Sequence, residues 1–258
     1  MTVFEKARPM NDAIIQPPEY YTRDDGVRLA FRHIKGRGPA IVFLPGYMSD
    51  MNGGKALAIA AWAAANGRAM LRLDYAGCGE SEGNFADATF KIWRDDVVAI
   101  IQQIAAGPVI LVGSSMGGWL MLMVALILKN DVKAMIGIAA APDFTDWGFT
   151  EFQRATILRD GVIYQDNPYG PDPTPTYLLL LKSGQAGRML AREIDISCPV
   201  RLLHGQCDAD VPWDISMQLA AALRSSDVQI SLVKDGDHRL SRDSDIALLL
   251  DTVRALPY

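Results

Sequence analysis

Ser115 is the residue in this chain whose surroundings most clearly indicate chemistry. It stands at the centre of a Gly-x-Ser-x-Gly motif that runs from Gly113 to Gly117. An apolar run precedes the motif, and an apolar stretch long enough for a helix follows it. This pattern is typical of a nucleophile elbow, a sharp strand-to-helix turn that lifts a serine above a sheet. Glycine is expected on both sides because so tight a turn leaves no room for a Cβ atom.

A serine nucleophile needs a base, and the base is found by elimination among the three histidines. In sheets of this type the chain order is serine, acid, histidine, so His33 comes too early. His204 ends an apolar run, where we expect a hydrogen-bonded structural role. His238 lies in a late loop before the last predicted helix, and we predict that it accepts the proton of Ser115.

The acid is expected at the end of the strand that precedes the histidine. Asp208 comes first after the run ending at His204 and is the preferred candidate. Asp210 lies nearer the next helix. Its side chain would either cap that helix or stay in solvent. Asp143, at the end of an earlier strand, is the third candidate. The acid would accept the Nδ1 proton of His238 and stabilise the imidazolium that forms.

Acyl transfer also requires backbone donors for the oxyanion. One is the N–H of Met116, which follows the nucleophile at the start of its helix. The other is predicted to be the N–H of Tyr47, in the loop that follows the apolar strand ending at Leu44. Gly46 would allow the backbone of that loop to turn.

Strands and helices that alternate along the chain must position these residues. The strands are continuous apolar runs, which indicates a mainly parallel sheet covered by helices on both faces. Strands are predicted at 39–44, 68–74, 108–113, 132–139, 199–204 and 228–233, after a hairpin at 20–32. Helices are predicted at 55–65, 93–105, 116–129, 213–223 and 243–255.

The alternation is interrupted between 143 and 193 by a proline-rich stretch that is too long for an ordinary connection. We interpret it as a cap over the sheet, with helical pieces near 152–158 and 176–190. The chain therefore divides into a core (20–142 and 194–258), a cap (143–193) and an N-terminal arm (1–19).

Bulk properties exclude several classes of protein. The formal net charge of −5 argues against a nucleic-acid partner. Three scattered cysteines argue against a disulfide framework and favour a reducing, cytoplasmic location. The longest apolar run has about half the ~20 residues that a membrane span needs, and the N-terminus lacks a signal pattern. We expect no cofactor and no metal, since Asp95-Asp96 fits a solvated first helical turn. Oligomeric state is not predicted.

Taken together, these motifs resemble the α/β-hydrolase family over the chain from about Tyr20 onward. The resemblance rests on the elbow, the Tyr47 loop, the Asp74-Tyr75-x-Gly77-x-Gly79-x-Ser81 segment, His204-Gly205-x-x-Asp208 and Asp237-His238. More narrowly, the segments 46–59 and 198–213 are similar to the branch that includes the mitochondrial palmitoyl-protein thioesterase and mycophenolic acid acyl-glucuronide esterase. The chain looks like a bacterial-type relative of that branch.

The resemblance implies an α/β-hydrolase fold and hydrolysis of acyl esters or thioesters through an acyl-enzyme on Ser115. One alternative is a different reaction of the same triad, such as C–C bond hydrolysis. Another is a ligand-binding protein that keeps the fold without turnover, but such a protein has no need of an intact serine, acid and histidine. The substrate would be a small molecule or an acylated protein, and the cap would select the acyl group.

Overall fold

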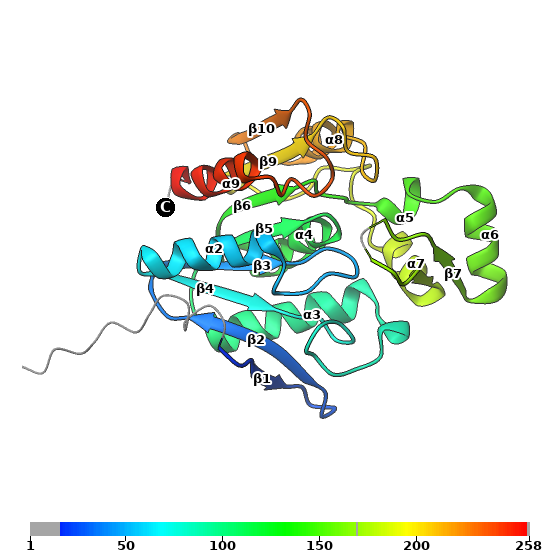
Figure 1. The fold of residues 1–258 in the computed structure, drawn as a ribbon, viewed down its shortest axis with the longest axis horizontal. Helices are drawn as coiled ribbons and strands as arrows, with labels where there is room; N and C mark the ends of the chain where they lie inside the picture. Colours follow the sequence, from blue (N-terminus) through cyan, green and yellow to red (C-terminus); the bar gives the residue numbers. More distant parts are fainter. Residues whose placement is uncertain (1–15, 169, 257–258) are drawn as a thin grey trace, which may run out of the picture.

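An eight-stranded sheet forms the centre of the computed structural model, which describes residues 16–168 and 170–256 (Figure 1). The strands lie in the order β1-β2-β4-β3-β5-β6-β9-β10. Only the β1–β2 and β2–β4 pairs of this sheet are antiparallel. The predicted hairpin and the mainly parallel sheet are therefore confirmed. The strands are β1 (Glu19–Thr22), β2 (Arg28–Ile34), β3 (Arg37–Leu44), β4 (Arg68–Leu73), β5 (Val109–Ser114), β6 (Val132–Ile138), β9 (Val200–Gly205) and β10 (Val228–Val233).

Helices cover both faces of this sheet. Because side chains alternate along a strand, β3 directs Ile41 and Phe43 into one core and Val42 and Leu44 into the other. Helices α2 and α9 close the first core, and α3, α4 and α8 close the second. The helices are α2 (Gly54–Ala65), α3 (Phe90–Ile100), α4 (Met116–Leu128), α8 (Asp214–Ala222) and α9 (Asp243–Ala255).

The predicted helix at 93–105 differs most from the structure among the core elements. It begins earlier, at Phe90, where the side chain of Thr89 accepts a hydrogen bond from the N–H of Ile92. It ends at Ile100 and continues as a π-helical turn, Ile101–Ala105. The start was missed because Thr89 is an N-cap residue that the apolar periodicity does not reveal.

Helix α4 is buried on nearly all sides, which explains its continuous apolar sequence. It packs against β5, α3 and β6. In the described part of the chain, no helix combines the length and apolar character that crossing a bilayer requires.

The chain reverses its direction of travel across the sheet between β3 and β5. From β3 it passes to β4 on one side, and it then returns to form β5 on the other side of β3. The loops that leave the carboxyl ends of β3 and β5 diverge at such a point, and in open α/β sheets ligands bind there. The Tyr47 loop follows β3, and Ser115 follows β5.

A small group of elements between 143 and 193 lies at one end of the molecule, beside the sheet (Figure 1). It contains an antiparallel hairpin and three short helices. They are α5 (Phe144–Trp147), α6 (Glu151–Asp160), β7 (Val162–Gln165), β8 (Thr174–Tyr177) and α7 (Leu178–Ala186).

The hairpin was not predicted, and the expected helix at 176–190 is wrong at both ends, since it stops at Ala186. Residues 174–177 form β8, and the helix begins only at Leu178. Pro175 lies in a two-stranded sheet, where a missing backbone N–H is tolerated at an edge. The proposed division into core and cap stays a prediction. The predicted arm lies mostly outside the described residues, and its last residue, Glu19, already belongs to β1.

Candidate functional site

Ser115 occupies the turn between β5 and α4, as the elbow motif predicts. Its φ of 53° lies in the left-handed region, which is strained for a residue with a side chain. Three backbone hydrogen bonds hold this conformation. The Ser115 N–H donates to Ile138 O at 2.9 Å, and Ser115 O accepts from Gly118 N at 2.8 Å and from Ala141 N at 3.0 Å.

The two glycines that flank the motif are required by close approach of the backbone. A Cβ atom at Gly113 would lie 2.4 Å from Gly117 O. One at Gly117 would lie 2.1 Å from Leu44 O, in β3. The expectation that the turn leaves no room for side chains is therefore confirmed.

Ser115, His238 and Asp208 form a continuous chain of hydrogen bonds. The Ser115 hydroxyl lies 3.0 Å from His238 Nε2, and His238 Nδ1 lies 2.8 Å from Asp208 Oδ2. Since a carboxylate only accepts, Nδ1 of His238 carries a proton and Nε2 is left to accept from the serine. The structure thus brings together the three residues that the sequence analysis selected as nucleophile, base and acid.

The side chain of Asp208 is fully buried, and its surroundings favour the ionised form. Burial alone would raise the pKa of Asp208, but hydrogen bonds from His204 and His238 outweigh it and hold the pKa below its usual value. The backbone N–H of Val211 donates to Oδ1 at 2.8 Å, and that of Asp210 at 2.9 Å. An ionised acid is therefore available to the histidine.

His204 has the structural role that the sequence analysis expected. It is completely buried, with Nε2 3.0 Å from Val211 O and 3.2 Å from Asp208 Oδ2. Because the carbonyl oxygen of Val211 only accepts, Nε2 carries the proton, and Nδ1 accepts from the hydroxyl of Ser216 at 2.7 Å. His204 thereby joins β9 to the segment that carries Asp208.

The other candidates for acid and base have different surroundings. His33 lies in β2, where burial lowers its pKa. The carboxylate of Asp143 accepts hydrogen bonds from the backbone N–H groups of Met189 and Leu190, at 2.9 Å each. Asp143 therefore fastens the first residue of the 143–193 segment to a point near its end. The sequence did not reveal this role.

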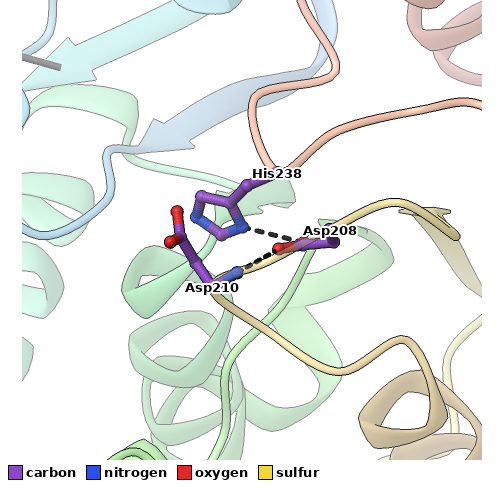
Figure 2. A group of neighbouring side chains, drawn as sticks. All are labelled: Asp208, Asp210 and His238. Atoms are coloured by element: carbon purple, nitrogen blue, oxygen red, sulfur yellow. Dashed lines mark hydrogen bonds and ion pairs between the residues drawn. The ribbon is translucent and has the colours of Figure 1, made fainter. Parts of the chain in front are cut away.

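Asp210 lies on the other side of the His238 ring from Asp208 (Figure 2). One carboxylate oxygen from each aspartate and one ring nitrogen of His238 lie within 4.8 Å of one another. In the described part of the chain this is the one such group with spacing that suits a metal ion. The expectation of a metal-free site stays a prediction.

The loop after β3 passes beside the nucleophile. A Cβ atom on Gly46 would lie 3.4 Å from Ser115 Cβ, so the loop and the elbow are in direct contact. Met116 is the first residue of α4, where an N–H has no acceptor within the helix. The two predicted oxyanion donors thus lie on adjoining segments, Tyr47 in the loop after β3 and Met116 at the start of α4. Their function stays a prediction.

The side chain of Tyr47 connects this loop to the hairpin of the 143–193 segment. Its hydroxyl donates to Pro175 O at 2.7 Å, and its ring lies 5.4 Å from that of Phe85 and 6.2 Å from that of Phe144. Burial raises the pKa of Tyr47, so the phenol stays protonated as a donor. The sequence predicted a role only for the backbone of this residue.

The glycine-rich segment that follows β4 forms hydrogen bonds to the loop after β3. The buried hydroxyl of Tyr75 donates to Pro45 O at 2.9 Å. The buried carboxylate of Asp74 accepts from the N–H groups of Met51 and Glu80, at 2.7 and 2.9 Å. The sequence placed this segment at the end of a strand but did not reveal this role.

A pocket of about 710 Å³ opens above Ser115 and His238. Its apolar wall combines the loop after β3 with the 143–193 segment. That wall includes Tyr47, Met48, Met116, Phe144, Trp147 and Phe149. Among the methionines, Met48 and Met116 line the pocket, whereas Met121 and Met123 are buried within α4.

The profile of the α/β-hydrolase family matches residues 41–251. The chain belongs to the α/β-hydrolase family. The predicted fold class is therefore confirmed.

This α/β-hydrolase is 40% identical over 238 residues to the human mitochondrial palmitoyl-protein thioesterase ABHD10. The aligned region covers 91% of this chain and 78% of the relative. The solved structure of the mouse alpha/beta hydrolase domain-containing protein 10 superposes with a TM-score of 0.87 and 39% identity, over 93% of this chain and 98% of the other. A putative hydrolase from Agrobacterium vitis S4 has the same TM-score at 36% identity, over 93% and 99% of the two chains. The predicted class, a serine hydrolase of esters or thioesters, is therefore confirmed.

Proposed function

We propose that Ser115, His238 and Asp208 are the nucleophile, general base and orienting acid of acyl-thioester or ester hydrolysis. The observation that carries this proposal is the chain of hydrogen bonds from Ser115 through His238 to Asp208, at the floor of the pocket. A serine hydroxyl is a weak nucleophile near neutral pH, and an adjacent base removes that limitation.

In acylation, Ser115 Oγ attacks the acyl carbonyl carbon while its proton passes to His238 Nε2. The carbonyl oxygen becomes an oxyanion, which the N–H groups of Tyr47 and Met116 stabilise. The N-terminal end of α4 adds positive potential there. Ionised Asp208 stabilises the imidazolium through Nδ1 and keeps the ring in its orientation.

Collapse of the tetrahedral intermediate breaks the bond to the leaving group. His238 returns its proton to the departing sulfur or oxygen, and the acyl group stays on Ser115. In deacylation, His238 takes a proton from water, whose oxygen attacks the acyl carbon. The acid product then leaves, and the proton returns to Ser115.

The substrate class that we favour is a long-chain fatty acyl group held as a thioester on a protein cysteine. Two observations support this choice. The mammalian relatives at about this level of identity carry the name palmitoyl-protein thioesterase. The pocket has a wall of aromatic and methionine side chains, and such surfaces gain free energy by removing an acyl chain from water.

We also propose a reducing, cytoplasmic location. The described chain has three free thiols. Burial raises the pKa of Cys78 to about 12 and that of Cys198 to about 11, so both stay as unreactive thiols.

A panel of acyl esters and acyl-thioesters of graded chain length tests the function. We expect the wild type to hydrolyse both classes and to prefer longer acyl chains. The Ser115→Ala variant is expected to lose at least about 10³-fold in kcat because the attacking atom is absent. Circular dichroism and thermal unfolding check that the variant is folded. Full activity in a folded Ser115→Ala protein would contradict the proposal.

A further inference from the structure

Lys55 contributes a charged side chain to the site that the mechanism above does not use. Its ammonium group donates to the backbone carbonyl of Arg239, the residue directly after His238. The two residues are 184 positions apart in the sequence. Lys55 lies in the first turn of α2, and both Lys55 and Arg239 line the pocket beside His238.

The loop that carries His238 needs tethers on both sides of the histidine. At its start, the N–H of Cys207 donates to Gly236 O at 2.9 Å. Just beyond the histidine, Leu240 has a φ of 41°, a left-handed conformation that is strained for a branched side chain. The N–H of Leu240 donates to Asp237 Oδ1 at 3.0 Å, but that bond lies within the loop itself. The bond from Lys55 fastens this strained part of the loop to a different layer of the fold.

The position of Lys55 is unfavourable for a positive charge. A cation in the first turn of a helix is repelled by the helix dipole. Burial, with the nearby charge of Arg239, lowers the pKa of Lys55 to about 8, although Asp237 and Asp245 act in the opposite direction. An apolar side chain would fill the same space without the unfavourable dipole and burial of the charge. The feature that only the lysine adds is its hydrogen bond to the His238 loop.

We propose that Lys55 is a positioning residue: it holds the His238 loop, through the carbonyl of Arg239, at the distance from which His238 Nε2 reaches Ser115. This inference rests on the proposed function of Ser115 and His238. It concerns the proton transfer and not the recognition of the acyl chain. Loss of the tether is therefore expected to lower kcat and to leave KM nearly unchanged.

Three variants test this role. Lys55→Met keeps the length and apolar stem but removes the donor, and Lys55→Arg restores a cationic donor. Lys133→Met is the matched control, because Lys133 also donates from its ammonium to a backbone carbonyl, that of Asn130 at 2.9 Å, away from the site. Each is compared with the wild type for kcat and KM on a short p-nitrophenyl ester. The rate of labelling by a fluorophosphonate probe is measured as well, since it reports serine activation alone.

A small misplacement of a catalytic group costs up to about 10²-fold, so Lys55→Met is expected to lower both kcat and the labelling rate by about 10- to 100-fold. Lys55→Arg should recover most of the loss, and Lys133→Met should resemble the wild type. Thermal unfolding shows whether each protein is folded at the assay temperature. A folded Lys55→Met protein with wild-type kcat and labelling rate would overturn the proposal. So would an equal loss in Lys133→Met. Absence of labelling in the wild type would instead contradict the proposed function.

Discussion

Asp208 is distinguished from Asp210, only two positions away, by what surrounds each carboxylate. The side chain of Asp208 is fully buried and accepts from His238 Nδ1 and from two backbone N–H groups. Asp210 is exposed and faces the pocket. We therefore expect different effects on kcat when each of the two carboxylates is replaced by a neutral amide.

Asp208→Asn is expected to lower kcat by about 10⁴-fold, because the amide no longer fixes the proton of His238 on Nδ1. Asp210→Asn is the matched control, and we expect a loss of less than about tenfold. Steady-state kinetics on the same ester measures both. Equal losses in the two variants would contradict the assignment of the acid.

The lowered pKa of Asp208 also predicts the direction of a stability change. Its ionised form contributes to folding above the unfolded pKa of about 3.9, and that contribution is lost as the pH falls through the lower folded value. The difference in free energy of unfolding between the wild type and Asp208→Asn should therefore shrink when the pH is lowered below about 4. Urea unfolding at several pH values provides this second readout.

Sequence order and residue type were sufficient to select Ser115, Asp208 and His238 because each follows a predicted strand. They could not reveal Lys55 or Asp143. Both act on backbone groups far away in the sequence, Lys55 on Arg239 O and Asp143 on Met189 N. Such bonds depend on how elements pack, and no local motif encodes them.

Two structural elements meet at Tyr47: the loop after β3 and the hairpin β7–β8. The hydroxyl of Tyr47 donates to Pro175 O in β8, and the ring packs between Phe85 and Phe144. The side chain of Tyr47 therefore joins the loop beside the nucleophile to one wall of the pocket. The alternation of strands and helices predicted the core, but the hairpin was missed because proline obscured its strand pattern.

Tyr47→Phe removes this hydrogen bond and keeps the ring. Because one such bond contributes about 0.5–1.5 kcal/mol, we expect KM for a long-chain acyl thioester to rise about two- to tenfold. KM for an acetyl ester, whose acyl group is too short to contact the 143–193 segment, should change less. Tyr20→Phe, on the exposed edge strand β1, is the control. An unchanged KM for the long-chain substrate would show that the hairpin is held by other contacts.

At the scale of the whole molecule, the residues of the site gather where the chain changes direction across the sheet, between β3 and β5. Strands β3 and β5 are neighbours, and their loops bring Tyr47, Ser115 and Met116 to one edge. The other half of the chain adds Asp208, in the loop after β9, and His238, in the loop between β10 and α9. Both halves of the sequence are thus needed to complete one site.

The central claim is that an acyl group is transferred to Ser115 before water releases it. Rapid acid quenching of the enzyme with a long-chain acyl thioester, followed by peptide mass spectrometry, tests it directly. We predict a mass increase of one acyl group on the peptide that contains Ser115, and no such increase in Ser115→Ala. Acylation of a different residue during productive turnover, for example the exposed Cys207, would contradict the account.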